Sequence, residues 1–189
     1  MASAQAALER LCDPSSEVSA HYLISGRGDV TQLVEEDQRA WHAGQGEWAG
    51  LDDINSRSIG IELDNRGDHP FAEPQMQALE TLLFNIMARH DIPAEGVIGH
   101  SCMAPGRKID PGPRFDWARL ARRGLALPAG DGPVPDSVTA ETFRDAVRAA
   151  GFTAPCDNDT LLSTVRMRFR PWGSGPLTPA DLAALPRAH

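Results

Sequence analysis

The feature that most constrains the fold is an amphipathic segment, residues 73–90, which lies between two short apolar runs. The runs, residues 58–63 and 97–99, are bounded by polar, proline or glycine residues, and this pattern predicts buried strands, the second ending at His100. The order strand, helix, strand favours a parallel pair joined by a right-handed crossover. The helical side chains on one face are Met76, Leu79, Leu82, Leu83, Ile86 and Met87. We therefore expect an α/β fold, with a mixed β-sheet flanked by helices.

Around this centre, the sequence predicts further elements from propensity and turn signals. A helix is expected over residues 2–12, and two strands, residues 18–24 and 30–34, are expected to form an antiparallel hairpin through a glycine-containing turn. Further helices are expected towards the C-terminus, over residues 118–124, 140–150, 159–169 and 179–185. The expected organisation is a main domain over residues 1–126, a Pro- and Gly-rich linker over 127–138, and a small three-helix module over 139–189.

Composition narrows the class of partner. The net charge of −8 and the absence of basic runs argue against nucleic acid as a partner. No apolar run is long enough to span a membrane, and the first residues lack the pattern of a secretory signal. The three scattered cysteines suggest reduced thiols, so a cytoplasmic location is expected for the chain as written. We also expect a monomer. A periplasmic or envelope location is the alternative if the natural N-terminus carries a signal.

The segment of residues 97–117 concentrates groups that carry chemistry. His100 follows the expected strand, and Asp110 lies in a loop stiffened by proline. Imidazole and carboxylate groups are good zinc ligands, but a catalytic zinc usually takes three protein ligands and the segment supplies two. Lys108 would lie close enough to stabilise an oxyanion, as amide hydrolysis at zinc requires. The alternative is that the histidine and the aspartate are capping or solvated groups.

Glu62 is the second group of chemical interest, because it interrupts an otherwise apolar strand. Such a carboxylate usually pairs with a cation or faces water. In a pocket, however, desolvation would raise its pKa towards the range of a general base. If residues 58–63 and 97–99 were adjacent parallel strands, Glu62 and His100 would lie at the same carboxyl edge, where ligands collect in α/β sheets. The interior Gly60 indicates close approach of another backbone.

Residues 39–51 have no helical or strand period and contain two tryptophans, Trp41 and Trp48. Their rigid aromatic faces could line a groove for a sugar or a peptide. Anchoring of a long loop to the core is an equally good interpretation. His42 lies between them in the sequence, and a single histidine in such a loop is more often a positioning group than a metal ligand.

Four motifs occur in a characteristic order, namely HYLI at 21–24, RAWHAG at 39–44, INSRSIGIEL at 54–63 and GHSCMAPGRKIDPGPRFDW at 99–117. In this order they resemble the zinc-dependent N-acetylmuramoyl-L-alanine amidases of the type 2 amidase family, and the resemblance covers residues 4–125. The segment from Val138 onward resembles, more loosely, a helical peptidoglycan-binding module through FRDAVRAAGF and VRMRFRP.

The resemblance implies a reaction and residue roles. The family cleaves the amide between the lactyl group of N-acetylmuramic acid and L-alanine of the stem peptide, so peptidoglycan or a muropeptide is the implied partner. By motif, His100 and Asp110 are implied Zn²⁺ ligands, Glu62 the general base towards the attacking water, and Lys108 the group that stabilises the oxyanion. Residues expected to contact the substrate are Trp41, His42, Trp48 and Asn65.

Two departures from the family pattern affect this interpretation. The remaining zinc ligand of the family is a histidine on a strand that would precede Met1, so we expect a start placed too late or a trimmed chain. His21 or His42 as a substitute ligand is the minor alternative. Cys102 stands where the family more often has aspartate, and we expect a packed small residue there. The rival functions are a non-catalytic peptidoglycan-binding protein with an incomplete metal site and a zinc peptidase acting on the stem peptide.

Overall fold

The computed structural model describes residues 4–186, which divide into two compact units. The first unit comprises the chain up to Gln45 together with residues 53–92. The second comprises residues 46–52 and the chain from Pro93 onward. The expected boundaries at residues 126 and 139 stay a prediction. None of the described helices is long and apolar enough to cross a membrane.

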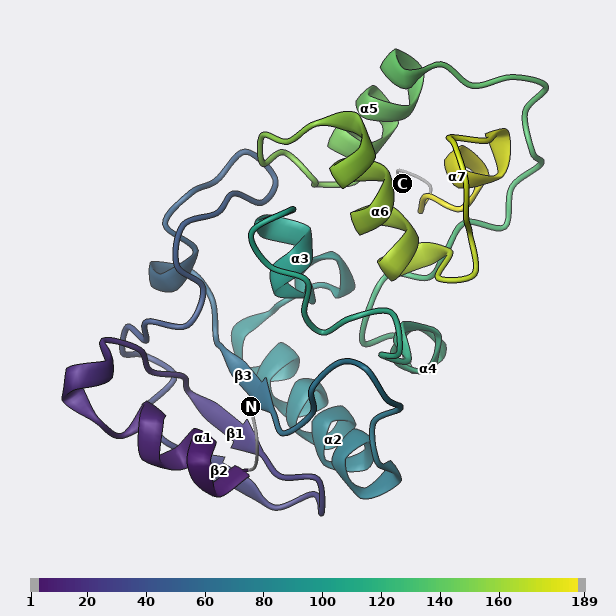
Figure 1. Ribbon diagram of the computed structural model, residues 1–189. Coiled ribbons are helices and arrows are strands. Elements are labelled where there is room, and N and C mark those ends of the chain that lie inside the picture. The colour runs from purple at the N-terminus through teal and green to yellow at the C-terminus, as the bar shows by residue number, and fades with distance from the viewer. Residues whose placement is uncertain (1–3, 187–189) are drawn as a thin grey trace. The chain divides into compact units, whose positions relative to one another are not determined.

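The first unit is built on a small mixed sheet of three short strands (Figure 1). These are β1 (Tyr22–Ile24), β2 (Val30–Gln32) and β3 (Ile61–Leu63), in the order β2-β1-β3. The strand β1 pairs antiparallel with β2, which confirms the predicted hairpin. It also pairs parallel with β3, with Leu23 opposite Glu62. Because β1 lies in the centre, all three of its residues are buried, whereas those of β2 are exposed.

Two helices pack on the central strand β1. They are α1 (Ala4–Leu11) and α2 (Glu73–His90), and the second has the predicted bounds. The predicted apolar face of α2 is largely correct, with Met76, Leu79, Leu83 and Ile86 buried. The helix also buries Gln75, whose Nε2 donates to the carbonyl of Ile24 at 3.0 Å and fixes α2 on the strand. Single 3₁₀ turns at Pro14–Ser16 and Ile54–Ser56 complete the unit. A mixed sheet with flanking helices confirms the α/β class.

The prediction of a strand over residues 97–99 is wrong. A 3₁₀ turn, Ala94–Gly96, leads into this run, and the short helix α3 (His100–Met103) follows it directly. The carbonyl of Val97 accepts a hydrogen bond from the side chain of Arg168, at 3.2 Å. In a strand, this carbonyl would accept from the backbone amide of a neighbouring strand. The expected pairing of residues 58–63 with 97–99 is therefore also wrong, since β3 pairs with β1.

The second unit is helical, and in Figure 1 its C-terminal helices run from green to yellow. It contains α4 (Trp117–Arg122), α5 (Ala140–Ala149), α6 (Asn158–Phe169) and α7 (Pro179–Ala183), close to the predicted positions. Thr139 and Thr178 form capping boxes that begin α5 and α7. The core of this unit consists of Cys102, Phe143, Val147, Phe152, Leu161, Leu162, Val165, Phe169, Ala184 and Leu185.

A buried ion pair joins the last two helices, α6 and α7. Arg166, on α6, donates from Nε and Nη2 to the two carboxylate oxygens of Asp181 on α7, at 2.8 and 2.7 Å. The carbonyl of Gly175 accepts from Nη1 of Arg166, and the carbonyl of Pro176 accepts from Nη2. Asp181 is fully buried, so burial opposes its ionisation, but the hydrogen bonds from Arg166 and Thr178 hold the pKa of its carboxyl well below the usual range.

Candidate active site

The structure brings His100 and Asp110 together in the second unit. His100 is the first residue of α3, and its Nδ1 lies 2.5 Å from Oδ2 of Asp110. A backbone hydrogen bond joins the same two parts of the chain, because the amide of Ser101 donates to the carbonyl of Asp110 at 3.0 Å. The sequence prediction that these two side chains act together is thus consistent with the local geometry, although His100 starts a helix and does not end a strand.

The loop between them is fixed by short-range contacts. The amides of Arg107 and Lys108 both donate to the carbonyl of Ala104. Gly106 has a φ of 78°, in the left-handed region that favours glycine. Gly99 is required by close packing, since a Cβ there would lie 2.4 Å from Cδ of Pro111. The glycines and prolines of this segment therefore set the separation of the histidine from the aspartate.

Electrostatics favour an ionised aspartate at this place. Burial alone would raise the pKa of the Asp110 carboxyl. The hydrogen bond from His100, together with the charges of His100 and Lys108, outweighs that effect and lowers the pKa below its usual value. The side chain of His100 is 20% exposed and that of Asp110 is 53% exposed, so the pair is open to solvent and to a ligand.

The donor chemistry of this pair fits zinc. An imidazole nitrogen and a carboxylate oxygen that already face one another are two of the donor types that Zn²⁺ takes in catalytic sites. Within residues 4–186, no group of three or more His, Cys, Asp or Glu side chains that could hold a metal comes together. His100 and Asp110 therefore match two of the three protein ligands that a catalytic zinc usually has.

Glu62 and His42 both lie beside Gly60 in the first unit. Glu62 is half-buried in the middle of β3. The ring of His42 lies on the backbone of Gly60, where an added Cβ would be 2.3 Å from Cγ of the imidazole. Gly60 thus allows the approach of a side chain. A second backbone also approaches it as expected, because the carbonyl of Gly60 accepts hydrogen bonds from two backbone amides around the start of β1. The loop that carries His42 is held by Asn55, whose Oδ1 accepts from the amides of His42 and Ala43.

His21 is excluded as a substitute metal ligand. It is 1% exposed, and the amide of Gly60 donates to its Nδ1 at 2.9 Å. The proton is therefore on Nε2, which donates to the carbonyl of Gln38 at 3.0 Å. Since both ring nitrogens are used by the backbone, His21 has a structural role, and its ring packs edge-on against that of His42 at 5.7 Å.

The remaining predicted contact residues differ in their surroundings. Trp41 is 55% exposed, and the guanidinium of Arg39 lies over its ring, 4.2 Å from the ring centre. Trp48 packs edge-on against Phe152 at 4.9 Å, which favours the anchoring interpretation for this residue. Asn65 organises its own turn, because its Oδ1 accepts from the amide of Gly67 at 2.7 Å.

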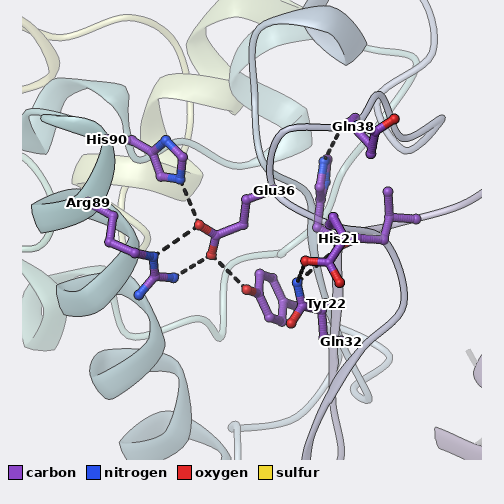
Figure 2. A network of polar contacts seen from close by, with 9 residues as sticks. His21, Tyr22, Gln32, Glu36, Gln38, Arg89 and His90 are labelled. Atoms are coloured by element: carbon purple, nitrogen blue, oxygen red, sulfur yellow. Dashed lines mark hydrogen bonds and ion pairs between the residues drawn. The ribbon is translucent and has the colours of Figure 1, made fainter.

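A polar network that the sequence did not suggest ties α2 to the strand β1 (Figure 2). Its centre is Glu36, which accepts hydrogen bonds from Tyr22 at 2.6 Å, from Nε of Arg89 at 3.0 Å and from His90 at 2.6 Å. The hydrogen bonds from Arg89 are the main cause that lowers the pKa of Glu36 to about 2. Burial, with the hydrogen bond to Glu36, raises the pKa of Tyr22 to about 12.

The sequence of residues 1–113 matches the Amidase_2 family, described as N-acetylmuramoyl-L-alanine amidase. The chain belongs to this family. Among curated amidases, the chain is 43% identical over 125 residues to N-acetylmuramoyl-L-alanine amidase AmiD of Escherichia coli K12, covering 58% of this chain and 45% of AmiD. It is 42% identical over 112 residues to 1,6-anhydro-N-acetylmuramyl-L-alanine amidase AmpD of Citrobacter freundii, covering 59% of each. The chain thus spans about half the length of these curated relatives.

Solved amidase structures match nearly the whole chain. A complex of Escherichia coli AmiD with the substrate anhydro-N-acetylmuramic acid-L-Ala-D-γ-Glu-L-Lys superposes with a TM-score of 0.87 at 32% identity, covering 96% of this chain and 82% of AmiD. The crystal structure of AmpDh3 from Pseudomonas aeruginosa gives a TM-score of 0.83 at 32% identity, covering 96% of this chain and 84% of that one. The fold of these amidases therefore extends through the C-terminal helices of this chain.

Sequence reasoning missed Arg168, a buried residue of α6 that contacts both ends of the segment carrying His100 and Asp110. The available signal was the pattern VRMRF, which places two arginines in a run of apolar residues at the end of a predicted helix. A charged residue in such a run either faces solvent or has a buried partner. The helical period alone does not decide between these two outcomes.

Proposed function

We propose that the chain hydrolyses the amide bond between N-acetylmuramic acid and L-alanine in muropeptides, with zinc as its metal. The observation that carries this proposal is the facing pair His100 and Asp110, which lies within the stretch that matches the amidase family. The same pair in a protein that only held a glycan would need no ionised carboxylate beside an imidazole and a lysine. Family membership and the fold support the same reaction class.

His100 and Asp110 are the residues that would hold the metal. When bound, zinc lowers the pKa of a water towards 7 and polarises the carbonyl of the scissile amide. The low pKa of Asp110 keeps a negative donor available at neutral pH. The backbone hydrogen bond from Ser101 to Asp110 keeps the imidazole of His100 close to the carboxylate of Asp110 in the absence of a metal.

Glu62 and Lys108 are proposed to serve in proton transfer and in stabilising negative charge. Glu62 is proposed as the general base that takes a proton from the attacking water and later returns it to the leaving amine of L-alanine. Lys108, half-buried and fixed at its backbone by Ala104, is proposed to stabilise the negative charge on the carbonyl oxygen of the tetrahedral intermediate. Simple binding would require neither a general base nor a cation that stabilises an oxyanion. The presence of both Glu62 and Lys108 therefore favours hydrolysis.

The substrate is proposed to be a soluble muropeptide, including the anhydro form. The support is that the solved complexes of AmiD and AmpDh3 hold anhydromuramyl peptides. Trp41 is proposed to contact a sugar ring, because its aromatic side chain is 55% exposed. His42 is proposed as a substrate contact because its ring is held in one orientation by Gly60, and Asn65 and Trp48 are proposed to act by shaping the adjoining loops.

The test compares Glu62→Gln with Asp64→Asn, a matched loss of charge two residues away. Wild type and Asp64→Asn are expected to release a peptide that begins with L-alanine from a purified muropeptide. Glu62→Gln is expected to hydrolyse at least about 100-fold more slowly while it retains muropeptide binding in calorimetry. Binding by wild type without any product would instead identify a binding protein.

A further inference from the structure

Arg168 is buried in the second unit with an incomplete set of partners. It lies near the end of α6 and is 6% exposed. Its Nη2 donates to the carbonyl of Val97 at 3.2 Å, and its guanidinium carbon lies 3.4 Å from the ring centre of Trp117. Its Nη1 is buried and has no hydrogen-bond partner among residues 4–186. Burial lowers the pKa of this guanidinium to about 10.

The guanidinium of Arg168 also lies 5.4 Å from the ring centre of its neighbour Phe169. Its contacts with Val97 and Trp117 lie at the two ends of one segment. Val97 precedes His100 by three residues, and Trp117 follows Asp110 by seven. Between them the chain forms α3 and the loop that returns to Asp110, and Cys102 of α3 is buried in the core that α6 shares. A single guanidinium therefore joins the start and the end of the segment to α6, while α3 packs on the same helix between them.

Stability alone does not account for an arginine at this place. A buried cation without a carboxylate partner loses hydration, which one hydrogen bond and two ring contacts only partly replace. An apolar side chain of similar size is often as stabilising. Arg166, two residues earlier on α6, is a buried arginine with a complete set of partners. Each nitrogen of its guanidinium group donates to Asp181 or to a backbone carbonyl. What Arg168 adds is a planar group that can stack on a ring and donate to a carbonyl at once.

We propose that Arg168 is a positioning residue for the His100–Asp110 pair, holding both ends of residues 97–117 on α6. The C-terminal helices then belong to the catalytic unit and are not only an appended binding module. The consequence for catalysis rests on the proposed function, whereas the structural claim can be tested without substrate or metal. Arg168 touches neither His100 nor Asp110 in any described contact, so it acts through the segment that carries them.

The test uses hydrogen exchange of the metal-free protein under native conditions. Arg168→Met removes the hydrogen bond and the planar stack but keeps an apolar side chain. Arg168→Lys keeps the charge and a donor but not the planar stack. Arg166→Met is the matched control, because it removes another buried arginine of the same helix, which contacts Asp181 and makes no described contact with residues 97–117.

The reporting amides are those of Ser101 and Lys108, which donate to the carbonyls of Asp110 and Ala104. Both are expected to exchange at least about tenfold faster in Arg168→Met, with Arg168→Lys between that variant and wild type. In Arg166→Met, faster exchange is expected over α7 and not at these two amides. Unchanged exchange at Ser101 and Lys108 in Arg168→Met would overturn the proposal, as would equal acceleration by Arg166→Met. If Arg168→Met does not fold, the comparison of Arg168→Lys with Arg166→Met decides in the same way.

Kinetics supply a second readout that a merely structural role would not move. At a temperature where all variants are folded, Arg168→Met is expected to lower kcat at least about tenfold with KM nearly unchanged, and Arg166→Met is expected to leave both nearly unchanged. A rise in KM alone would contradict positioning of the reactive pair. Absence of hydrolysis by wild type would count against the proposed function only, because the exchange measurement is independent of it.

Discussion

The imidazole of His42 lies directly on the backbone of Gly60, so closely that no side chain can replace the glycine hydrogen without displacing the ring. An added Cβ would be 2.3 Å from Cγ and 2.6 Å from Nδ1 of the imidazole. The same glycine donates its amide to His21 and accepts, at its carbonyl, from the amides of His21 and Tyr22. Gly60 therefore fixes the start of β3, two residues before Glu62, and the orientation of His42 together.

We predict that Gly60→Ala destabilises the protein by about 1–3 kcal/mol, because an overpacked methyl group must move either the ring or the strand. The free energy of unfolding can be measured by urea denaturation at pH 7. The control is Gly26→Ala, at a position where an added Cβ meets nothing within 4 Å. Equal stability of Gly60→Ala and Gly26→Ala would show that the contact between His42 and Gly60 is not maintained in solution.

The network around Glu36 predicts a pH dependence. The native pKa of about 2 lies below the usual value of 4.5, so the native state favours the ionised form. The resulting stabilisation, at most about 3 kcal/mol, is complete above about pH 5 and is lost as the pH falls from there towards 2. Glu36→Gln should therefore lower the free energy of unfolding at pH 7 and flatten its decline between pH 5 and 2.

The matched control for that measurement is Glu35→Gln. Glu35 is the neighbouring, exposed carboxylate, and one of its oxygens accepts a hydrogen bond from Gln32 at 3.2 Å. Its substitution is expected to leave the decline between pH 5 and 2 almost unchanged. A wild-type stability that does not fall over this pH range would contradict the central role of Glu36 in holding α2 to β1.

We predict an energetic coupling between Arg168 and a carboxylate introduced at the position of Cys102. The thiol is fully buried, and burial raises its pKa, while the charge of Arg168 acts in the opposite direction. Cys102→Asp would place a carboxylate near a guanidinium that has a free buried donor. We expect this change to be tolerated with Arg168 present and to cost about 3–5 kcal/mol in the Arg168→Met background, where the new charge is unpaired.

A double-mutant cycle by urea unfolding measures that coupling directly. An interaction free energy of at least about 1.5 kcal/mol between the introduced carboxylate and the guanidinium of Arg168 is the expected value for a charged hydrogen bond. Additive effects of the two substitutions would mean that the guanidinium does not reach the position of Cys102.

The elements that the sequence predicted well are those whose signal is local. The bounds of α2 follow from a long apolar period with Pro74 at its start, and the hairpin of β1 and β2 follows from a glycine-containing turn. Pairing over long distances was predicted wrongly, since the run of residues 97–99 is too short to distinguish a strand from an extended approach to a helix. The partner of β3 is β1, and nothing in the order of elements alone selects it.

The candidate site was predictable to the extent that its residues are close in sequence. His100 and Asp110 were predicted together because they belong to one short segment, and the structure places their side chains in contact. The assignment of Glu62 and Lys108 to roles in the reaction stays a prediction. The pattern VRMRF marks Arg168 as unusual, but the sequence does not identify its partners, because its contacts with Val97 and Trp117 span dozens of residues and depend on how α6 packs.

The bond that we expect the chain to cleave is the amide between the muramyl lactyl group and L-alanine. Mass spectrometry of the products formed from anhydro-N-acetylmuramyl tripeptide, with zinc supplied, identifies the bond that is broken. We predict two products, the free anhydro-N-acetylmuramic acid and an intact peptide with L-alanine at its N-terminus, both formed at least about 100-fold more slowly by Glu62→Gln. Cleavage only between amino acids of the peptide, or binding of the muropeptide with no cleavage by wild type, would show that the chain is not this amidase.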